Sequence, residues 1–292
     1  MTDKENMIPA GLAVEGGSFR GIFAAGVLDA MMESHLRFSD VAGISAGAMT
    51  LYDYVADIPG KSRKYYELIC HDPKFFGMHN LLTTGNFFNF DYMYECSNDQ
   101  YRTQEEAGVK NSLIHYEVGA TNCIDGKITW FSKRNMDLQQ FNHACHASSN
   151  VPGINEPVVI DGVPYVDGGV DCPIPYQRLF DLSCERAVVI LSHDLSTVFK
   201  PRNVLVEHHL EHKYRQYPYL VEKLRQTDVM HNEAYAELSK LQTAGKVFVF
   251  APSDAVKISS LERDPEKLEQ LYQDGLLQAR NRMPELMAFV HA

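Results

Sequence analysis

Apolar residues in the N-terminal part of the chain alternate between a pattern typical of strands and one typical of helices. Short apolar runs at 12–14 and 38–44 meet glycine at or near their ends, as buried strands at tight turns do. Each run is followed by apolar residues at helical spacing, over 22–32 and 46–55. The order strand, helix, strand, helix predicts a parallel sheet that is covered by helices on both faces.

The rest of the chain carries further strand and helix patterns. Strand patterns occupy 112–120, 127–132, 158–160, 163–166, 187–192 and 246–251, and helical patterns occupy 202–241, broken near Pro218, and 265–290. Phe75–Tyr94 is the most irregular stretch, because aromatic and methionine residues crowd there among glycine and asparagine. We expect this stretch either to border an apolar cleft or to pack only in the core.

The composition fits one large globular domain. The chain has 292 residues, of which 45% are hydrophobic. It shows neither an internal repeat nor a flexible linker, and we expect the strand near Val247 to rejoin the main sheet. The prediction is a single domain over 1–292, with a core at about 10–200 and C-terminal helices plus one strand at 201–292 packed on it.

The net charge argues against polyanionic partners. A net charge of −11 disfavours nucleic acid and electrostatic docking on anionic lipid. The basic groups at 61–64 and 213–215 are interpreted as solvated helix faces. Residues 1–6 lack a leader pattern, and no stretch reaches the roughly 18 apolar residues of a spanning helix, so a cytoplasmic protein is predicted.

Ser45 lies in a setting that suits a nucleophile. It is the centre of Gly43-Ile44-Ser45-Ala46-Gly47, between an apolar strand pattern and the start of a helical one. In such a turn the serine hydroxyl is exposed above the sheet, and the next backbone N–H, here that of Ala46, is a natural oxyanion donor. Because chance matches to so short a motif are common, the setting carries the argument.

Two further glycine turns supply the other groups that acyl transfer needs. Gly16 and Gly17 follow the first strand and let successive backbone N–H groups face an oxyanion, where each donor is worth about 3–4 kcal/mol in the transition state. Asp167 ends a strand pattern at Gly168-Gly169, where a carboxylate is framed stiffly enough to serve as a base. Each turn by itself is equally typical of an ordinary tight turn.

Together, these segments resemble those of patatin-like phospholipases. The family pattern combines a G-G-G-x-R/K-G loop, a G-x-S-x-G nucleophile and a D-G-G/A aspartate, and this chain follows it in order over roughly 11–200. Arg20 matches the loop, whereas Ser18 replaces its third glycine. The run Ala-Ser-Ser-Asn-Val-Pro-Gly at 147–153 also resembles the family.

The resemblance implies a three-layer α/β/α fold with a central, mostly parallel sheet and a helical C-terminal extension. It implies a serine lipid acyl hydrolase of the phospholipase A, lysophospholipase or carboxylesterase type, in which Ser45 attacks an ester, Asp167 is the base and an acyl-enzyme forms. The oxyanion and substrate-binding residues would be Gly16, Gly17, Ser18, Arg20 and Ala46. The resemblance implies no metal and no organic cofactor.

The resemblance also has consequences for partners and for position 18. The expected partners are a lipid or small ester and, transiently, a membrane surface, while the acyl chain, the head group and the oligomeric state stay open. If position 18 requires a positive φ, Ser18 costs about 1 kcal/mol or more of strain and could displace the oxyanion donors slightly, which would lower activity.

Other functions fit parts of this pattern. A Ser-Asp-His hydrolase needs a histidine after Asp167, and His193 is its best candidate because it follows a strong strand pattern. His208, His209 and His212 lie in a polar helical pattern and are interpreted as surface residues. A transacylase would use the same dyad with an alcohol as acceptor, and a lipid-binding protein would keep the fold without catalysis.

The cysteines suggest neither a zinc site nor a second nucleophile. Six cysteines are scattered without a C-x-x-C pair, so we expect free thiols. Cys145 lies close to His143 and His146, but this spacing is not typical of a Cys–His catalytic pair.

Overall fold

The computed structural model of the chain describes residues 7–90, 92, 99–254 and 256–292, and a mixed β-sheet lies at its centre. The eight strands in these residues have the order β5-β6-β3-β2-β1-β7-β8, and β4 pairs with β3 beside this path. They are β1 (Met7–Val14), β2 (Arg37–Gly43), β3 (His115–Asn122), β4 (Ile128–Ser132), β5 (Val158–Ile160), β6 (Val163–Asp167), β7 (Ala187–Ile190) and β8 (Val247–Phe250). The five neighbours from β3 to β8 in this order are parallel, whereas β4, β5 and β6 form antiparallel pairs.

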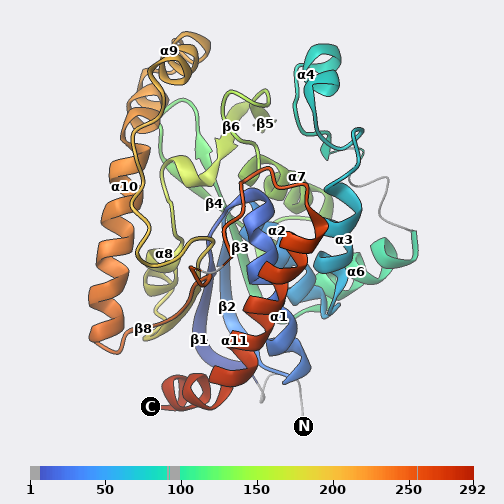
Figure 1. The fold of residues 1–292 in the computed structure, drawn as a ribbon, viewed down its shortest axis with the longest axis vertical. Coiled ribbons are helices and arrows are strands. Elements are labelled where there is room, and N and C mark those ends of the chain that lie inside the picture. Colours follow the sequence, from blue (N-terminus) through green and yellow to red (C-terminus); the bar gives the residue numbers. More distant parts are fainter. Residues whose placement is uncertain (1–6, 91, 93–98, 255) are drawn as a thin grey trace.

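Helices cover both faces of this sheet (Figure 1). They are α1 (Ile22–Glu33), α2 (Ala46–Ala56), α3 (Lys61–Ile69), α4 (Met78–Thr84), α6 (Asp99–Asn111), α7 (Leu138–Ser148), α8 (Tyr176–Asp181), α9 (Val204–Lys213), α10 (Pro218–Thr243) and α11 (Pro265–His291). Successive residues of β1 enter opposite layers: Leu12 and Val14 pack in the core with α1 and α11, and Ala13 packs in the core with α8 and α10. The predicted three-layer α/β/α fold with its helical C-terminal extension is confirmed.

Each strand and helix predicted from periodicity is found, and the strand near Val247 does rejoin the main sheet, because β8 pairs in parallel with β7. The helices α4, α6, α7 and α8 were not predicted, and α3 was anticipated only as a helix face at 61–64. α7 carried a readable signal, since Asp137 and Gln140 form a capping box at its start. α4 interrupts the irregular aromatic stretch, where apolar residues follow no helical period.

The C-terminal helix α11 lies directly against α1. A Cβ atom at Gly26 would be 2.2 Å from the carbonyl oxygen of Tyr272, and one at Gly275 would be 2.2 Å from that of Phe23. Because only glycine allows backbones to approach so closely, both positions fix the crossing of the two helices. The C-terminal helix α11 is therefore packed onto α1, the helix that follows the first glycine turn.

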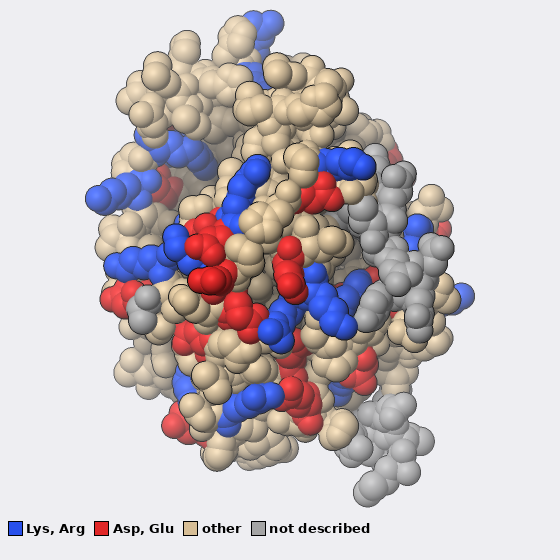
Figure 2. Space-filling view, turned by 45° about the vertical axis from the view of Figure 1, so that its right-hand side comes forward, with Lys and Arg blue, Asp and Glu red and all other residues tan. Residues whose placement is uncertain are grey.

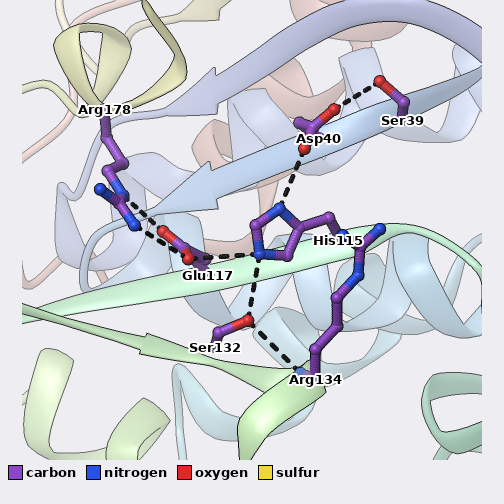
Figure 3. A network of polar contacts seen from close by, with 7 residues as sticks. All are labelled: Ser39, Asp40, His115, Glu117, Ser132, Arg134 and Arg178. Atoms are coloured by element: carbon purple, nitrogen blue, oxygen red, sulfur yellow. Dashed lines mark hydrogen bonds and ion pairs between the residues drawn. The ribbon is translucent and has the colours of Figure 1, made fainter. Parts of the chain in front are cut away.

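A partly buried polar network joins β2, β3 and α8 (Figure 3). His115 Nδ1 lies 2.9 Å from Asp40 Oδ1, and Arg178 Nε donates to Glu117 Oε2 at 2.6 Å. Burial raises the pKa of Glu117, but hydrogen bonds from His115 and Arg178 outweigh this and lower the pKa to about 2. The network keeps charged side chains satisfied inside the fold.

The described residues bear on the predictions drawn from charge, apolar runs and cysteines. Acidic and basic side chains are interspersed on the face shown in Figure 2. None of the described helices is both long and apolar enough to cross a bilayer. The five cysteines in the described residues are free thiols, whereas Cys96, Met93, Tyr94 and residues 1–6 lie outside them.

Candidate active site

Ser45 occupies the sharp turn between β2 and α2. Its φ of 54° and ψ of −128° are unusual for a residue with a side chain, as a nucleophile elbow requires. Its backbone N–H donates to Ser148 Oγ at 2.9 Å, which ties the turn to the end of α7. A Cβ atom at Gly47 would be 2.4 Å from the carbonyl oxygen of Val14, so the turn packs too tightly against β1 for any larger residue.

Asp167 ends β6 and points at Ser45. Its carboxylate accepts hydrogen bonds from the Ser45 hydroxyl and from the Gly169 N–H, the latter at 2.8 Å. Its backbone is held as well, because its N–H donates to Asn150 O at 2.9 Å and its carbonyl accepts from Thr121 Oγ1 at 2.9 Å. Burial raises the pKa of Asp167 to about 6, against the opposing effect of the two hydrogen bonds.

The glycine loop, residues 15–21, lies against this pair. A Cβ atom at Gly16 would be 2.8 Å from Ser45 Cβ, which places the loop backbone beside the nucleophile. The N–H groups of Phe19 and Arg20 donate to Ser260 O and Gly17 O, whereas within the described residues those of Gly16 and Gly17 have no partner. The N–H of Ala46, the first residue of α2, likewise has no intrahelical partner. Three N–H groups without such partners thus lie in the two segments that meet at Ser45, the glycine loop and the start of α2.

Ser18 and Arg20 complete the loop. Ser18 has a φ of 54°, so its position does require the left-handed region, where a residue other than glycine costs about 1–2 kcal/mol. Tyr66 donates its hydroxyl to Ser18 O at 3.2 Å. Arg20 Nε donates to Ile258 O at 3.2 Å, a contact that joins the loop to the C-terminal region.

A pocket of about 960 Å³, part of it open to solvent, starts at Ser45 and follows α2. The residues of α2 that line it share one face of the helix: Ala46, Met49, Thr50, Tyr52 and Asp53. Asp53 lies eight positions after Ser45, so the pocket runs for about 12 Å along the helix axis. Its walls are mainly apolar near the serine.

The irregular aromatic stretch reaches this pocket. Phe75, Phe88 and Phe90 line it, and all three are also part of the main hydrophobic core. Phe87 packs against the core without lining the pocket. The two interpretations of the stretch therefore describe the same rings, which wall a cleft on one side and pack in the core on the other.

The far end of the pocket is charged. Lys61 Nζ lies 3.1 Å from Asp53 Oδ1 and forms a second ion pair with Glu105, while Ser62 Oγ donates to Asp53 Oδ2 at 2.5 Å. The prediction that Lys61 lies on a solvated helix face is wrong, because only 14% of its side chain is exposed. Periodicity could not show this, since Glu105 comes from a distant helix. Burial and the neighbouring Asp53 raise the pKa of Glu105.

The alternative nucleophile and bases lie elsewhere. His193 Nδ1 is 2.9 Å from Ser192 Oγ, and burial together with the charge of Arg20 lowers the pKa of His193 to about 4. His208, His209 and His212 are exposed on α9. Cys145 is buried in α7, where burial raises its pKa to about 12. Among the described residues, neither His193 nor Cys145 lines the pocket with Ser45.

Four residues in or beside the site were given no role from the sequence: Ser148, Glu15, Ser192 and Tyr235. Ser148 stood inside the run at 147–153, where only the resemblance pointed to it. Glu15 precedes the two glycines, and its carboxylate accepts from the Ser192 N–H and the Tyr235 hydroxyl. The sequence did show a glutamate between an apolar run and the two glycines. It could not show that this glutamate is buried or which residues it contacts, because those residues lie far away along the chain.

Two family models match the chain. The model described as patatin-like phospholipase matches residues 12–178, a span that contains the glycine loop, Ser45 and Asp167. A second model, described as a domain of unknown function (DUF6363), matches residues 217–291, which contain α10 and α11 up to His291. The first match covers more than half of the chain.

Two bacterial proteins are similar to the chain in sequence. Over 195 residues the chain is 28% identical to the uncharacterized protein YjjU of Escherichia coli strain K12, which covers 65% of this chain and 54% of that protein. Over 179 residues it is 21% identical to the uncharacterized NTE family protein Rv1063c of Mycobacterium tuberculosis strain H37Rv, covering 61% and 48%. The chain thus spans about half the length of these curated relatives.

Two solved structures share the fold. VipD from Legionella pneumophila has a TM-score of 0.50 at 13% identity, covering 97% of this chain and 66% of that one. Human GIVD cytosolic phospholipase A2 in complex with methyl gamma-linolenyl fluorophosphonate has a TM-score of 0.52 at 11% identity, covering 100% and 60%. At these identities the likeness concerns the fold alone.

Proposed function

The chain belongs to the patatin-like phospholipase family, and we propose that it is a serine lipid acyl hydrolase that works through a Ser45–Asp167 dyad. The observation that carries this proposal is the hydrogen bond from the Ser45 hydroxyl to the buried Asp167 carboxylate, at the head of a largely apolar pocket. Family membership supports a lipid ester hydrolase in general, and the dyad is the finer step.

In the proposed reaction, Asp167 takes the proton of the Ser45 hydroxyl as its oxygen attacks the ester carbonyl. The negative charge moves to the carbonyl oxygen, where the N–H groups of Gly16, Gly17 and Ala46 stabilise it. The tetrahedral intermediate then collapses to an acyl-serine, and the leaving alkoxide receives the proton from Asp167. Water repeats the sequence with the acyl-serine, which releases the carboxylic acid and restores both residues.

The raised pKa of Asp167 suits this role. An ordinary aspartate is a weak base, whereas a carboxylate with a pKa of about 6 takes a proton more readily and is still mostly ionised at neutral pH. Because Asp167 contacts Ser45 directly, the proposed reaction needs no histidine between them. His193 instead contacts Ser192 beside the glycine loop.

The pocket and the surface around it support a lipid substrate. Met49, Phe75 and Phe88 offer apolar walls to an acyl chain that is esterified next to Ser45. The helices α4 and α9 project at one end of the molecule (Figure 1), and both carry exposed apolar side chains. Leu82 on α4 is 81% exposed and Leu205 on α9 is 79% exposed.

These two helices flank the segment that follows the pocket residue Val151. The N–H of Glu156 donates to Asn86 Oδ1, just after α4, and the Glu156 carboxylate pairs with Lys213 at the end of α9. We infer a transient contact between this end of the molecule and a lipid surface, from which the ester enters the pocket. Apolar side chains exposed on both helices suit such a surface.

Labelling with a fluorophosphonate tests the proposal. Wild-type protein should be labelled at Ser45 and should hydrolyse soluble esters or lysophospholipids, whereas Ser45→Ala should be unlabelled, inactive and folded. Ser149→Ala is the matched control, because Ser149 also lines the pocket and is buried. It should keep both labelling and activity.

The result also separates the alternatives. Absence of labelling in folded wild-type protein would favour a lipid-binding protein. Loss of activity in His193→Ala as complete as in Ser45→Ala would favour a triad. Transfer of the acyl group to an added alcohol, in preference to water, would assign the chain as a transacylase.

A further inference from the structure

Glu15 is a buried carboxyl group that the proposed reaction does not use. Only 3% of the residue is exposed, and it directly precedes Gly16 in the glycine loop. Its Oε2 accepts a hydrogen bond from the Ser192 N–H at 2.6 Å. Burying a carboxyl group costs free energy unless hydrogen bonds compensate for the lost hydration.

The second partner of Glu15 comes from the C-terminal region. Tyr235 of α10 donates its hydroxyl to Glu15 Oε2 at 2.9 Å and lies 3.2 Å from Oε1. Tyr235 is itself only 5% exposed, and its ring packs against Phe199. Residue 235 lies within the part of the chain, 217–291, that matches a domain of unknown function.

This contact sits one residue away from the proposed oxyanion donors. A Cβ atom at Gly17 would be 2.5 Å from Ser192 Cβ, so the loop rests on the same residue that binds Glu15. On the other side, Gly16 is in contact with Ser45. The position of the Gly16 and Gly17 N–H groups relative to the serine therefore depends on how Glu15 and Ser192 are held.

The same region holds the loop at two more points. Ser260 O accepts from the Phe19 N–H at 3.2 Å, and Ile258 O accepts from Arg20 Nε at 3.2 Å. Both acceptors precede α11, which packs on α1 immediately after the loop. Three contacts from residues 217–291 thus converge on residues 15–20.

We propose that Tyr235 and Glu15 form a clamp that positions the oxyanion donors, and that the C-terminal region is for this reason part of the catalytic apparatus. The inference rests on the proposed Ser45 chemistry. Both side chains are positioning residues, since neither lines the pocket at Ser45. Oxyanion donors act only when they are aimed at the transition state, and an error of about 1 Å can cost a hundredfold in rate.

The chain offers a matched pair of variants to test the clamp. Tyr235→Phe removes one hydroxyl that binds the buried carboxyl of Glu15. Tyr272→Phe removes one hydroxyl that binds the buried carboxyl of Asp29 at 2.7 Å. Both tyrosines lie in 217–291 and both are 5% exposed, but Asp29 belongs to α1 rather than to the glycine loop.

The readouts are kcat and KM for a soluble short-chain p-nitrophenyl ester, the rate of Ser45 labelling by a fluorophosphonate, and the melting temperature. We expect Tyr235→Phe to lower kcat and the labelling rate by about tenfold or more, with little change in KM, because the lost alignment matters in the transition state. Tyr272→Phe should lower the melting temperature by a similar amount and leave kcat within about twofold.

Each result decides between outcomes. Equal effects of the two substitutions on kcat would overturn the clamp and leave only a structural role for Tyr235. Failure of wild-type protein to be labelled at Ser45 would instead overturn the proposed function itself. If Tyr235→Phe does not fold, Glu15→Gln and Glu15→Met replace it: the amide keeps an acceptor for Ser192 and should retain most of kcat, whereas equal kcat for the two would refute the clamp.

Discussion

Replacing Asp167 by asparagine should abolish turnover and at the same time stabilise the fold. Asparagine has nearly the same shape and keeps an oxygen that can accept from the Gly169 N–H, but it cannot take the Ser45 proton. It also removes a charge that is costly to bury. Loss of function and gain of stability in one substitution would indicate a strained catalytic group.

The magnitude follows from the raised pKa of Asp167. The pKa rises from 3.8 to about 6, mainly through burial, so the folded protein holds this proton at a pH where the unfolded chain has released it. Stability from this group is therefore fully present below about pH 4 and is lost as the pH rises through 6. A shift of about two pKa units corresponds to roughly 3 kcal/mol, which is an upper value for the gain of Asp167→Asn at pH 8.

Urea unfolding of both proteins at pH 8 and pH 4 measures this gain. The variant should be more stable than wild type at pH 8, and the gap should close toward pH 4. In parallel, kcat/KM of wild type should fall about tenfold between pH 7 and pH 5, as Asp167 is protonated. Asp171→Asn is the control, because it removes a nearby carboxylate that pairs with Lys223 and should lower stability without abolishing activity.

Two results would refute this reasoning. Equal stability of the variant and wild type at pH 8 would mean that the Asp167 carboxylate is not destabilised by burial. Normal turnover by the folded variant would remove Asp167 from the dyad altogether.

Three further predictions test the glycine loop, the pocket and the polar network between β2, β3 and α8. Ser18→Gly removes the strain of a positive φ and should keep or raise kcat, so a large loss would show that the hydroxyl takes part. Glu105→Leu replaces one charged group at the pocket end by an apolar one while Asp53 and Lys61 stay paired. The preference for longer acyl chains should rise by up to about fourfold for each additional buried methylene, and an unchanged chain-length profile would contradict the assigned pocket direction. Glu117 has a pKa lowered to about 2 from 4.5, so its contribution, up to about 3 kcal/mol, is present above pH 4.5 and lost as the pH falls toward 2; Glu117→Gln should be less stable than wild type at pH 7, with a gap that closes in acid, as urea unfolding would show.

Local patterns in the sequence determined the elements and the chemistry at each turn. Hydrophobic period and glycine positions were enough to place β1, α1, β2 and α2, and with them the turn that carries Ser45. The Asp-Gly-Gly turn at 167 was likewise readable where it stands. Such patterns are local because each reports only how a few neighbouring residues face solvent or core.

Which of these groups meet was decided by tertiary structure. Asp167 reaches Ser45 because β6 pairs antiparallel with β3, which in turn lies beside β2. Strand order is a property of the whole sheet, and no short pattern encodes it. In the same way, periodicity does not predict that Lys61 forms an ion pair with Glu105 from another helix.

The C-terminal region shows this division most clearly. The sequence predicted its helices and the strand near Val247, but not that Tyr235 contacts Glu15 across 220 positions. A helical period indicates that a residue faces inward but not which residue it contacts. A buried side chain can pack against any neighbour that has a suitable shape and suitable hydrogen-bonding groups. Only the packing of α10 and α11 on the sheet selects the glycine loop as that neighbour.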